Sequence, residues 1–513
     1  MLPLLQGIRV LDFTTIVLGP YATQTLGDLG ADVVKIEPLQ GDLFRTVRPG
    51  RSRSMGAGFM GFNRNKRSLA IDLKRPESRA VLARLVSGAD AVVHNMRPKA
   101  AEPLGLTYGQ LARIKPDLVY AFAAGYDQSG PNANEPAYDD IAQAAAGVAA
   151  LNANAQGEPR YLATILCDKV GGLHLAIAVA TGLAHRARTG QGCCIEAPMF
   201  ESTVAFLLSE QLGGETFVPA LGPTGYDRLA APNRKPYRTQ DGFMAILPYN
   251  GAHWAAFFEI IGRAEFAHSP QVQDPVLRSQ SVDSLYAIIA EIAPTRTTAA
   301  WLESLRSADI PCARVNAIGE LLQDPHLLAT GFFQEYDHPT EGRLRAPRSP
   351  FRWPGGTEAA DRHAPRPGGD SRSVLTEAGF AGEEIDRLAA DGVIGLDDGT
   401  SADVSGFRIH GIASAHDELK TDAAGRHQFL GYAVEVGPWV VYHSGDTRLY
   451  PGLAERLRRF RIDVALLPVG GTYTSWGDIR LNSIYPVVEG YKDLLAVGFR
   501  LDFRNPLRFN GFD

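Results

Sequence analysis

The start of the chain alternates short apolar runs with helical patterns, and this alternation constrains the fold more than any other feature of the sequence. Residues 8–13 and 32–37 have the apolar and β-branched character of strands, and the helical pattern of residues 21–29 lies between them. The same alternation repeats through residues 80–93 and 108–122. Strands that alternate with helices predict an α/β protein with a parallel sheet. No G-x-G-x-x-G motif follows the first strand, so a nicotinamide dinucleotide site has little support.

The rest of the chain changes character twice. At roughly 150 residues per domain, the 513 residues allow about three domains. Residues 222–242 are rich in loops, and the strand-like residues 243–247 with the helical patterns after them indicate a second domain. Residues 350–370 are rich in Pro and Gly, which predicts a surface connection, and a further boundary is expected near residue 395. The helical patterns of the second domain cover residues 254–261, 285–292 and 299–305.

The net charge and the cysteines exclude several classes of protein. The 51 Lys and Arg against 57 Asp and Glu give a formal net charge of −6, which argues against a general nucleic-acid binder. The four cysteines form no C-x-x-C pair, as is typical of a reducing cytoplasm. The N-terminus lacks a signal-peptide pattern, and the most apolar stretch, residues 173–184, contains His174 and is too short to span a bilayer. We therefore expect a cytoplasmic protein that binds neither nucleic acid nor a membrane.

Three groups of short motifs follow one another along the chain. They are residues 19–22, 29–38 and 41–42; residues 63–68, 72–74 and 95–98; and residues 138–139, 168 and 186–192. Each motif alone is weak, but their order and spacing carry a strong signal. Together they resemble the class III coenzyme A transferases, the family of formyl-CoA transferase, carnitine CoA-transferase and α-methylacyl-CoA racemase. The resemblance covers residues 5–394.

The resemblance implies a large Rossmann-like domain, a smaller α+β domain, and two chains interlocked as a homodimer. On this basis residues 1–220 begin the large CoA-binding domain, residues 221–330 form the small domain, and residues 331–394 return to the large one. Residues 395–406 are then a linker, and residues 407–513 an extension. The resemblance implies an acyl-CoA and a carboxylic acid as partners, with coenzyme A as a substrate and no tightly bound cofactor.

Asp168 is the residue on which we expect the chemistry to depend. It follows the apolar residues 162–167 and precedes Gly171 and Gly172, so its carboxylate is expected to be partly desolvated and still approachable. The local sequence alone favours a helix N-cap, because Asp is preferred there and a helix can begin at Lys169. The resemblance assigns Asp168 as the nucleophile. The two roles are compatible, since a helix N-terminus stabilises an anion.

The implied chemistry is covalent catalysis by a carboxylate. Asp168 attacks the thioester of a donor acyl-CoA, a mixed anhydride forms, and the CoA thiolate returns to give an aspartyl-CoA thioester, from which an acceptor acid takes CoA. Main-chain N–H groups near Gly171 are expected to stabilise the oxyanions. Cys167 is expected to belong to the core rather than to act as a thiol nucleophile, because no His is near it in the sequence.

The phosphates of CoA need cations and hydrogen-bond donors. Arg64, Lys66 and Arg67 belong to a basic cluster with Lys74 and Arg97, and such a cluster is most often a solvated basic face. In the context of the motifs we expect Lys74 and Arg97 to contact phosphates. Two further residues are expected to line the groove for the adenosine or pantetheine part, namely Asn95 and Met96. The resemblance adds three more CoA contacts, namely Ile16, Ile71 and Met199.

The dipeptide Tyr138-Asp139 favours one branch of the family. The racemase branch carries His before this Asp, and Tyr, with a pKa of about 10, is a poorer base at neutral pH than His, with a pKa of about 6.5. Transferases similar to formyl-CoA transferase carry Tyr, so Tyr138 and Asp139 are expected to support a transferase site. Tyr138 is alternatively a packed aromatic, and Asp139 a cap of the following helix. A racemase or isomerase of the same family and a catalytically silent acyl-CoA-binding protein remain the alternative functions.

Two departures from formyl-CoA transferase concern the substrate. Val17, a residue expected to support the active site, stands where that enzyme carries Gln. Residues 228–237 lack its glycine-rich lid. Both departures argue against formate or oxalate as the substrate, and Val17 with Leu18 suits a more apolar acyl group.

The extension resembles the later part of a metallo-β-lactamase-fold hydrolase of the lactonase type, from residue 407 to about residue 470. In that fold the counterparts of His416 and Asp446 bind metal. The sequence has no H-x-H-x-D-H segment, and these two residues fall short of the three protein ligands that a catalytic zinc keeps. We therefore expect His416 and Asp446 to be remnants, zinc to be absent, and the extension to be a partial metallo-β-lactamase-like segment.

Overall fold

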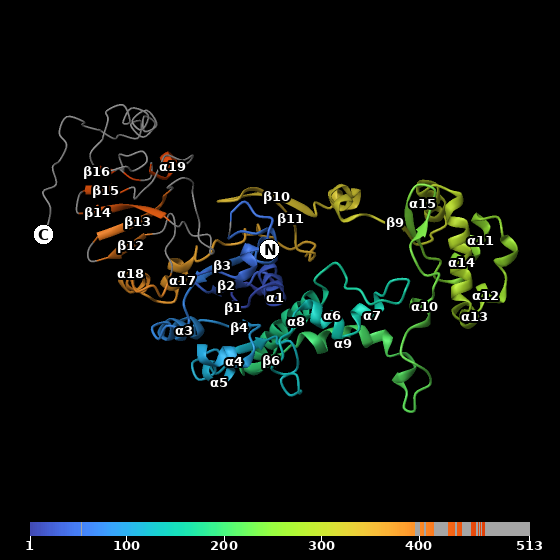
Figure 1. The fold of residues 1–513 in the computed structure, drawn as a ribbon, viewed down its shortest axis with the longest axis horizontal. Helices are drawn as coiled ribbons and strands as arrows, with labels where there is room; N and C mark the ends of the chain where they lie inside the picture. The colour runs from blue at the N-terminus through green and yellow to red at the C-terminus, as the bar shows by residue number, and fades with distance from the viewer. Residues whose placement is uncertain are drawn as a thin grey trace. The chain divides into compact units, whose positions relative to one another are not determined.

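The computed structural model describes residues 1–52, 54–394, 401–404, 407–414, 429–436, 439–443, 453–457, 460, 462 and 464–466. These residues form two compact units. The first unit contains Met1–Thr203, Tyr336–Leu344 and the described residues from Ser349 onward, and the second contains Val204–Glu335 and Arg345–Arg348. The first unit is therefore built from segments that precede and follow the second in the chain, as the colours of Figure 1 show.

Six parallel strands form the central sheet of the first unit, in the order β3-β2-β1-β4-β5-β6. The apolar residues of β1 to β4 are buried, as expected for a parallel sheet covered on both faces. The chain runs outward from β1 to β3 and then crosses to β4 on the other side of β1, which creates a topological switch point between β1 and β4. The predicted α/β fold with a parallel sheet is confirmed. The strands are β1 (Arg9–Phe13), β2 (Asp32–Glu37), β3 (Lys66–Ala70), β4 (Ala91–His94), β5 (Val119–Phe122) and β6 (Cys193–Glu196).

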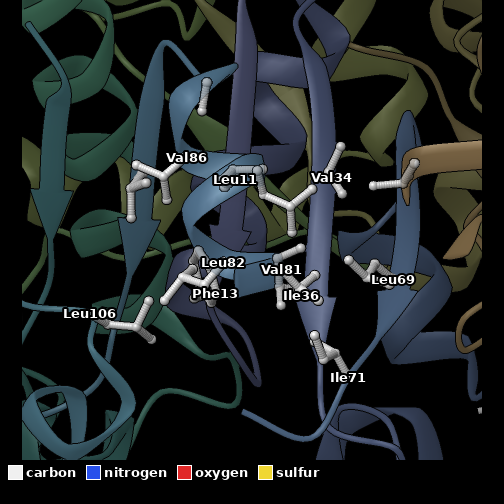
Figure 2. Close-up of a cluster of buried hydrophobic side chains, with 14 of the residues drawn as sticks. Leu11, Phe13, Val34, Ile36, Leu69, Ile71, Val81, Leu82, Val86 and Leu106 are labelled. Atoms are coloured by element: carbon white, nitrogen blue, oxygen red, sulfur yellow. The ribbon is translucent and has the colours of Figure 1, made fainter. Parts of the chain in front are cut away.

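The main hydrophobic core lies between this sheet and helix α3 (Ser78–Ser87). Val81 of α3 belongs to one cluster with Leu11 of β1, and Figure 2 shows their side chains in the same layer. Leu375 and Ile385, from the segment that follows the second unit in the chain, belong to the same cluster. The sheet therefore depends on residues that lie far apart in the sequence. Those two residues come from α17 (Ser371–Glu377) and α18 (Gly382–Ala390).

Helix α8 (Leu166–Thr189) packs against α1 (Leu18–Asp28) and against β5 and β6. By length and composition alone its 24 residues are apolar enough to cross a membrane, with a mean hydropathy of 1.3 in the most apolar window. That window is 56% buried inside the structure. The apolar residues 173–184 are thus the middle of a longer helix. Packing inside the first unit explains the buried ones, such as Leu175 and Val179, whereas Leu173 and Ile177 are exposed.

The second unit combines an antiparallel sheet with helices around Trp254 and Trp301, which are both fully buried. Its helices match the three predicted helical patterns, so those predictions are confirmed. The predicted strand 243–247 ends one residue earlier, at Ile246. The elements are α11 (Gly251–Ile260), α14 (Val282–Ile292), α15 (Thr298–Ser307), β7 (Tyr237–Arg238), β8 (Phe243–Ile246) and β9 (Cys312–Arg314). A separate hairpin pairs β10 (Phe333–His338) with β11 (Gly342–Pro347).

The described residues after 400 form a five-stranded sheet in chain order, antiparallel from β12 to β15 and parallel between β15 and β16. A small core with Ile412, Ala433 and Tyr442 lies on it. β12 occupies part of the range predicted as a linker, because it pairs with β13. The elements are β12 (Ser401–Val404), β13 (Phe407–Ser414), β14 (Phe429–Val436), β15 (Trp439–His443), α19 (Leu453–Leu457) and β16 (Val464–Leu466).

Candidate active site

The switch point between β1 and β4 is the place where open α/β sheets bind ligands. The chain leaves β1 through residues 14–17, which we call the β1–α1 turn, and it leaves β4 at Asn95. The Asn95 side chain joins the two loops, because its Oδ1 accepts the N–H of Thr15 at 2.9 Å and its Nδ2 donates to the carbonyl of Thr15 at 2.9 Å. Asn95, predicted to line the CoA groove, thus uses both polar groups of its side chain on the protein backbone.

The β1–α1 turn contains Ile16 in the left-handed region, with φ of 70°. Such a conformation is rare for a β-branched residue. Asp42 Oδ1 accepts the N–H of Ile16 at 3.1 Å and the hydroxyl of Thr15 at 2.9 Å. Lys35 pairs with Asp42 Oδ2 at 2.8 Å and donates to the carbonyl of Thr14 at 2.9 Å. Burial alone would raise the pKa of Asp42, but Lys35 and the hydrogen bonds outweigh it and hold that pKa below its usual value.

Asp168 lies in the first turn of α8, which begins at Leu166. The prediction that Asp168 caps a helix beginning at Lys169 is therefore wrong. Asp139 is the cap, since its Oδ1 accepts the N–H of Cys167 at 2.7 Å and that of Asp168 at 3.1 Å. A carboxylate from a distant segment has replaced the local N-cap and leaves the carboxylate of Asp168 free for another role.

The carboxylate of Asp168 has a perturbed proton affinity. Burial raises its pKa to about 7, with a further contribution from the negative charge of Asp139. Among the residues that the structure describes, no donor forms a hydrogen bond with its side chain. A carboxylate that is desolvated and receives no hydrogen bonds has nothing to offset the cost of its charge, which explains the direction of the shift.

The start of α8 packs closely on the start of α1. A Cβ on Gly171 would lie 2.8 Å from Leu18 Cδ1, and a Cβ on Gly172 would lie 2.6 Å from the carbonyl oxygen of Leu18. Residues three and four apart share a helix face, so Asp168 is on the same side of α8 as these glycines and faces the beginning of α1. The two helices therefore pack closely at this point. The expectation of oxyanion donors near Gly171 is wrong, because Gly171 is inside α8 and its N–H belongs to the helix.

Tyr138 and Asp139 are adjacent in sequence but differ in environment. The Tyr138 side chain is 64% exposed at the N-cap of α6 (Asp139–Ala145), so it is not a packed core aromatic. Asp139 is buried, and its Oδ2 accepts a hydrogen bond from Gln143 Nε2 at 2.6 Å. Gln143 Oε1 in turn accepts the N–H of Leu162. Asp139 is thus fixed by α6 and organises the start of α8 rather than capping α6.

The predicted CoA contacts fall into three groups by exposure. Lys74 and Arg97 are exposed, and Arg97 donates to the carbonyl of Asn134 at 3.2 Å. Met96 is half-buried against the main core, and Ile16 is half-buried in the β1–α1 turn. Ile71 and Met199 are almost fully buried, each at 2% exposure, so their side chains contribute packing. Val17, predicted to support the active site rather than to contact CoA, is likewise buried at 1% exposure.

Three residues of the predicted basic cluster are neutralised within the protein. Lys66 is buried and pairs with Asp12 at 3.0 Å, and burial lowers the pKa of Lys66 to about 8 despite this partner. Arg64 pairs with Asp28 at 2.5 Å. Arg67 pairs with both Asp32 and Glu377. Lys66 and Arg67 join β3 to β1 and β2, and Arg64 joins the residues before β3 to α1, so these side chains are not a solvated basic face.

Two features of the site escaped the sequence analysis. The first is the pair of Lys35 and Asp42, although both residues lie within the motifs at residues 29–38 and 41–42. The second is His94, which is buried with its Nδ1 accepting the N–H of Met96 at 3.1 Å and its Nε2 bonded to the hydroxyl of Tyr120. Burial lowers the pKa of His94 to about 4, so it is neutral and shapes the loop after β4. A polar residue at the end of an apolar strand is the signal that could have identified it.

Cys167 is fully buried, and burial raises the pKa of its thiol to about 11. The prediction that it belongs to the core is confirmed. His416 and Asp446 lie outside the described residues. Within the described part of the chain, no group of three His, Cys, Asp or Glu residues is arranged to hold a metal ion.

Proteins of known structure share this α/β fold. The chain is similar to the crystal structure of a CaiB/BaiF family protein from Brucella suis, with 27% identity and a TM-score of 0.62 over 73% of this chain and 99% of that chain. The family model described as CoA-transferase family III matches residues 5–371. The chain therefore belongs to CoA-transferase family III, and it is an enzyme of that family.

Named relatives agree with this assignment. The chain is 30% identical over 395 residues to the succinyl-CoA:glutarate CoA-transferase of Mus musculus, covering 76% of this chain and 90% of the relative. It is 33% identical over 332 residues to the acetyl-CoA:oxalate CoA-transferase of Acetobacter aceti, covering 63% of this chain and 83% of the relative. A second model, for a beta-lactamase superfamily domain, matches residues 336–481. The resemblance of the extension to that superfamily is thereby confirmed.

Proposed function

We propose that this enzyme moves CoA from an acyl-CoA donor to a carboxylic acid through covalent intermediates on Asp168. The observation that carries the proposal is the state of that carboxylate. It is largely desolvated, receives no side-chain hydrogen bond from the described residues, and has its pKa raised to about 7 by burial and then by Asp139. At neutral pH a large fraction of the Asp168 carboxylate is ionised. Because the carboxylate makes few interactions, it loses little when it attacks a thioester.

The reaction balances in four steps. The ionised Asp168 attacks the donor thioester carbonyl, and CoA thiolate leaves as a mixed anhydride forms. The thiolate attacks the aspartyl carbonyl of this anhydride, so the donor acid leaves and an aspartyl-CoA thioester remains. The acceptor carboxylate displaces the thiolate to form a second anhydride. Attack of the thiolate on the acceptor's acyl carbonyl then releases the new acyl-CoA and regenerates the carboxylate.

The start of α1 supports an acyl group that is more apolar than formyl or oxalyl. Val17 and Leu18 are apolar and buried, and Leu18 lies against α8 next to the face that carries Asp168. The mouse relative is named for succinyl-CoA and glutarate, which are longer than formate but carry a second carboxylate, and the Acetobacter aceti relative is named for acetyl-CoA and oxalate. The preference for an apolar acyl group therefore rests on Val17 and Leu18 alone. Lys74 and Arg97, both exposed, are the proposed phosphate contacts for CoA.

The proposal includes an interlocked homodimer in the cytoplasm. Apolar side chains on α8 and α9 (Met199–Gln211) are exposed in the single chain, among them Leu173, Ile177 and Phe206, and a second copy would bury them. The four steps need no resident cofactor, since Asp168 and the two substrates make every bond. The His416 and Asp446 pair is proposed to hold no zinc.

The test is to trap the intermediate. Asp168→Asn and Asp168→Ala should abolish CoA exchange between acyl-CoA and free acids in a mass-spectrometric panel, with the fold retained by circular dichroism. Hydroxylamine added to the unmodified enzyme with acyl-CoA should label the peptide that carries Asp168. Label on another peptide would overturn the mechanism, and α-deuterium exchange on 2-methylacyl-CoA would instead establish the racemase alternative.

A further inference from the structure

We infer that Asp42 is a positioning residue for acyl transfer, and that it acts by holding Ile16 in the left-handed conformation. The inference rests on the proposed role of Asp168. It adds an explanation of how the β1–α1 turn, which leads into the part of α1 that faces Asp168, is held in place. Asp42 does not contact Asp168, so its effect on the reaction passes through the β1–α1 turn.

The first observation is strain at Ile16. A β-branched side chain disfavours a φ of 70°. Among the described residues, the two other non-glycine residues with positive φ are Asn65 and Asp309, whose short polar side chains tolerate this region. Strained residues of this kind persist only where the surroundings over-determine them, and they cluster at functional sites. The strain therefore requires a specific restraint.

The second observation is the source of that restraint. The five main-chain polar groups from the N–H of Thr14 to the N–H of Ile16 are all bound by side chains rather than by a helix or a strand. In order, their partners are Asp12 Oδ1, Lys35 Nζ, Asn95 Oδ1, Asn95 Nδ2 and Asp42 Oδ1. The turn conformation is thus imposed by groups from β1, from β2, and from the loops that follow β2 and β4.

Asp42 is the partner that reaches the strained residue itself. Its Oδ1 accepts from the N–H of Ile16, the hydroxyl of Thr15 and the N–H of Phe44, while its Oδ2 pairs with Lys35. Its own N–H is held by Glu37 at 2.9 Å. An ionised carboxylate can serve this many donors, whereas an amide loses one acceptor and the attraction of Lys35. The restraint on Ile16 thus depends on the charge of Asp42.

The third observation connects the turn to Asp168. The turn ends at Val17, which is the N-cap of α1, and Leu18 is the residue on which Gly171 and Gly172 of α8 pack. The glycines share a helix face with Asp168. The conformation of Ile16 therefore sets where α1 begins relative to the reacting carboxylate. Small misplacements of this kind reduce the chemical step more than the binding of a remote nucleotide.

The test is a double-mutant cycle in the full chain. Asp42→Asn should lower kcat on the order of tenfold to a hundredfold and change the KM for acyl-CoA by a smaller factor, because the alignment of α1 is affected more than the single contact that Ile16 is expected to make with CoA. Ile16→Gly removes the strain, since glycine adopts this φ freely. In the Ile16→Gly background, Asp42→Asn should therefore cost much less than in the unmodified chain. Equal losses in both backgrounds would overturn the inference.

Two further variants separate positioning from stability. Asp28→Asn removes a buried carboxylate that pairs with Arg64 at the other end of α1, and it should reduce stability without changing kcat below the unfolding transition. If Asp42→Asn does not fold, Thr15→Val carries the test, since it deletes the hydroxyl bound to Asp42 and should lower kcat about threefold. An unchanged kcat in that variant would refute the inference. Asp168→Asn in the same assay reports on the proposed function separately.

Discussion

The carboxylate of Asp139 accepts the main-chain N–H of Asp168 at 3.1 Å, so one acidic residue caps the helix turn that carries another. This arrangement has two effects on Asp168. It fixes the backbone of the first turn of α8, and it places a negative charge close enough to raise the pKa of Asp168 further than burial does alone. The side chain of Asp139 is therefore both the cap of α8 and the charged neighbour of Asp168.

The pH profile should report this pair. The ionised form of Asp168 is the nucleophile, so kcat/KM should rise with pH through about 7 and then level off. Asp139→Asn keeps a capping oxygen but removes the charge, so the pKa of Asp168 falls and the rising limb should move to lower pH. Asp140→Asn, at an exposed neighbouring position, is the control. Identical profiles for Asp139→Asn and the unmodified enzyme would contradict the assignment.

The contact between α8 and α1 should tolerate no side chain at Gly172. A Cβ there would lie 2.6 Å from a backbone oxygen of Leu18, which cannot move as a flexible side chain can. Gly172→Ala should lower the free energy of unfolding by about 1–3 kcal/mol, measured by urea denaturation. Gly109→Ala, where a Cβ meets open space, should not destabilise the protein. Equal stability of the two variants would show that the helices can separate without cost.

The proposed phosphate contacts should affect substrate binding alone. Lys74→Ala and Arg97→Ala should each raise the KM for acyl-CoA roughly tenfold and leave kcat nearly unchanged, because a phosphate contact is made equally in the ground and transition states. Arg113→Ala, a change at an exposed cation elsewhere on the first unit, is the matched control. An unchanged KM in both test variants would remove the assignment.

The exposed apolar faces of α8 and α9 should lie in a subunit interface. Ile177→Asp and Phe206→Asp introduce a charge at side chains that are 59% and 53% exposed in the single chain. Both should shift the protein from dimer to monomer in sedimentation velocity, since burial of an unpaired charge is costly. Val276→Asp, exposed in the second unit, should leave the dimer intact. If the unmodified protein itself sediments as a monomer, the proposed homodimer is refuted.

The extension should carry no stoichiometric metal. Elemental analysis of the purified full chain should find well under one zinc per chain, because the sequence supplies fewer ligands than a catalytic zinc keeps. One equivalent of zinc together with lactonase activity would contradict this expectation.

The sheet and the reacting carboxylate were predictable from the sequence for different reasons. Strand alternation is local, so residues 8–13 and 32–37 identify two neighbouring strands without any tertiary information. Asp168 was predicted as the reacting residue because it belongs to one of the motifs that carry the family resemblance. Its position inside α8 was not predictable, because the cap that starts the helix at Leu166 comes from Asp139, 29 residues before Asp168.

The basic cluster shows the limit of the sequence analysis more clearly. In the sequence Lys66 has the pattern of a surface cation. In the structure it is buried against Asp12, which lies 54 residues earlier. Asp42 and Lys35 likewise acquire their role from a turn that neither residue borders in sequence. Charge patterns indicate that a residue is ionised, but only the tertiary contacts decide whether that charge faces a ligand or another side chain.

The hydrogen bonds of Ser68 in β3 carry a consequence for the order of synthesis. Its N–H is bound by Asp370, 302 residues later, and its hydroxyl accepts from the N–H of Gly368, 300 residues later. On the ribosome the whole second unit emerges before these partners exist, and domains generally fold as units during translation. Strand β3 at the edge of the first sheet therefore cannot form these hydrogen bonds until residue 370 has been translated. A chain truncated before residue 370 would lack the bond to Asp370.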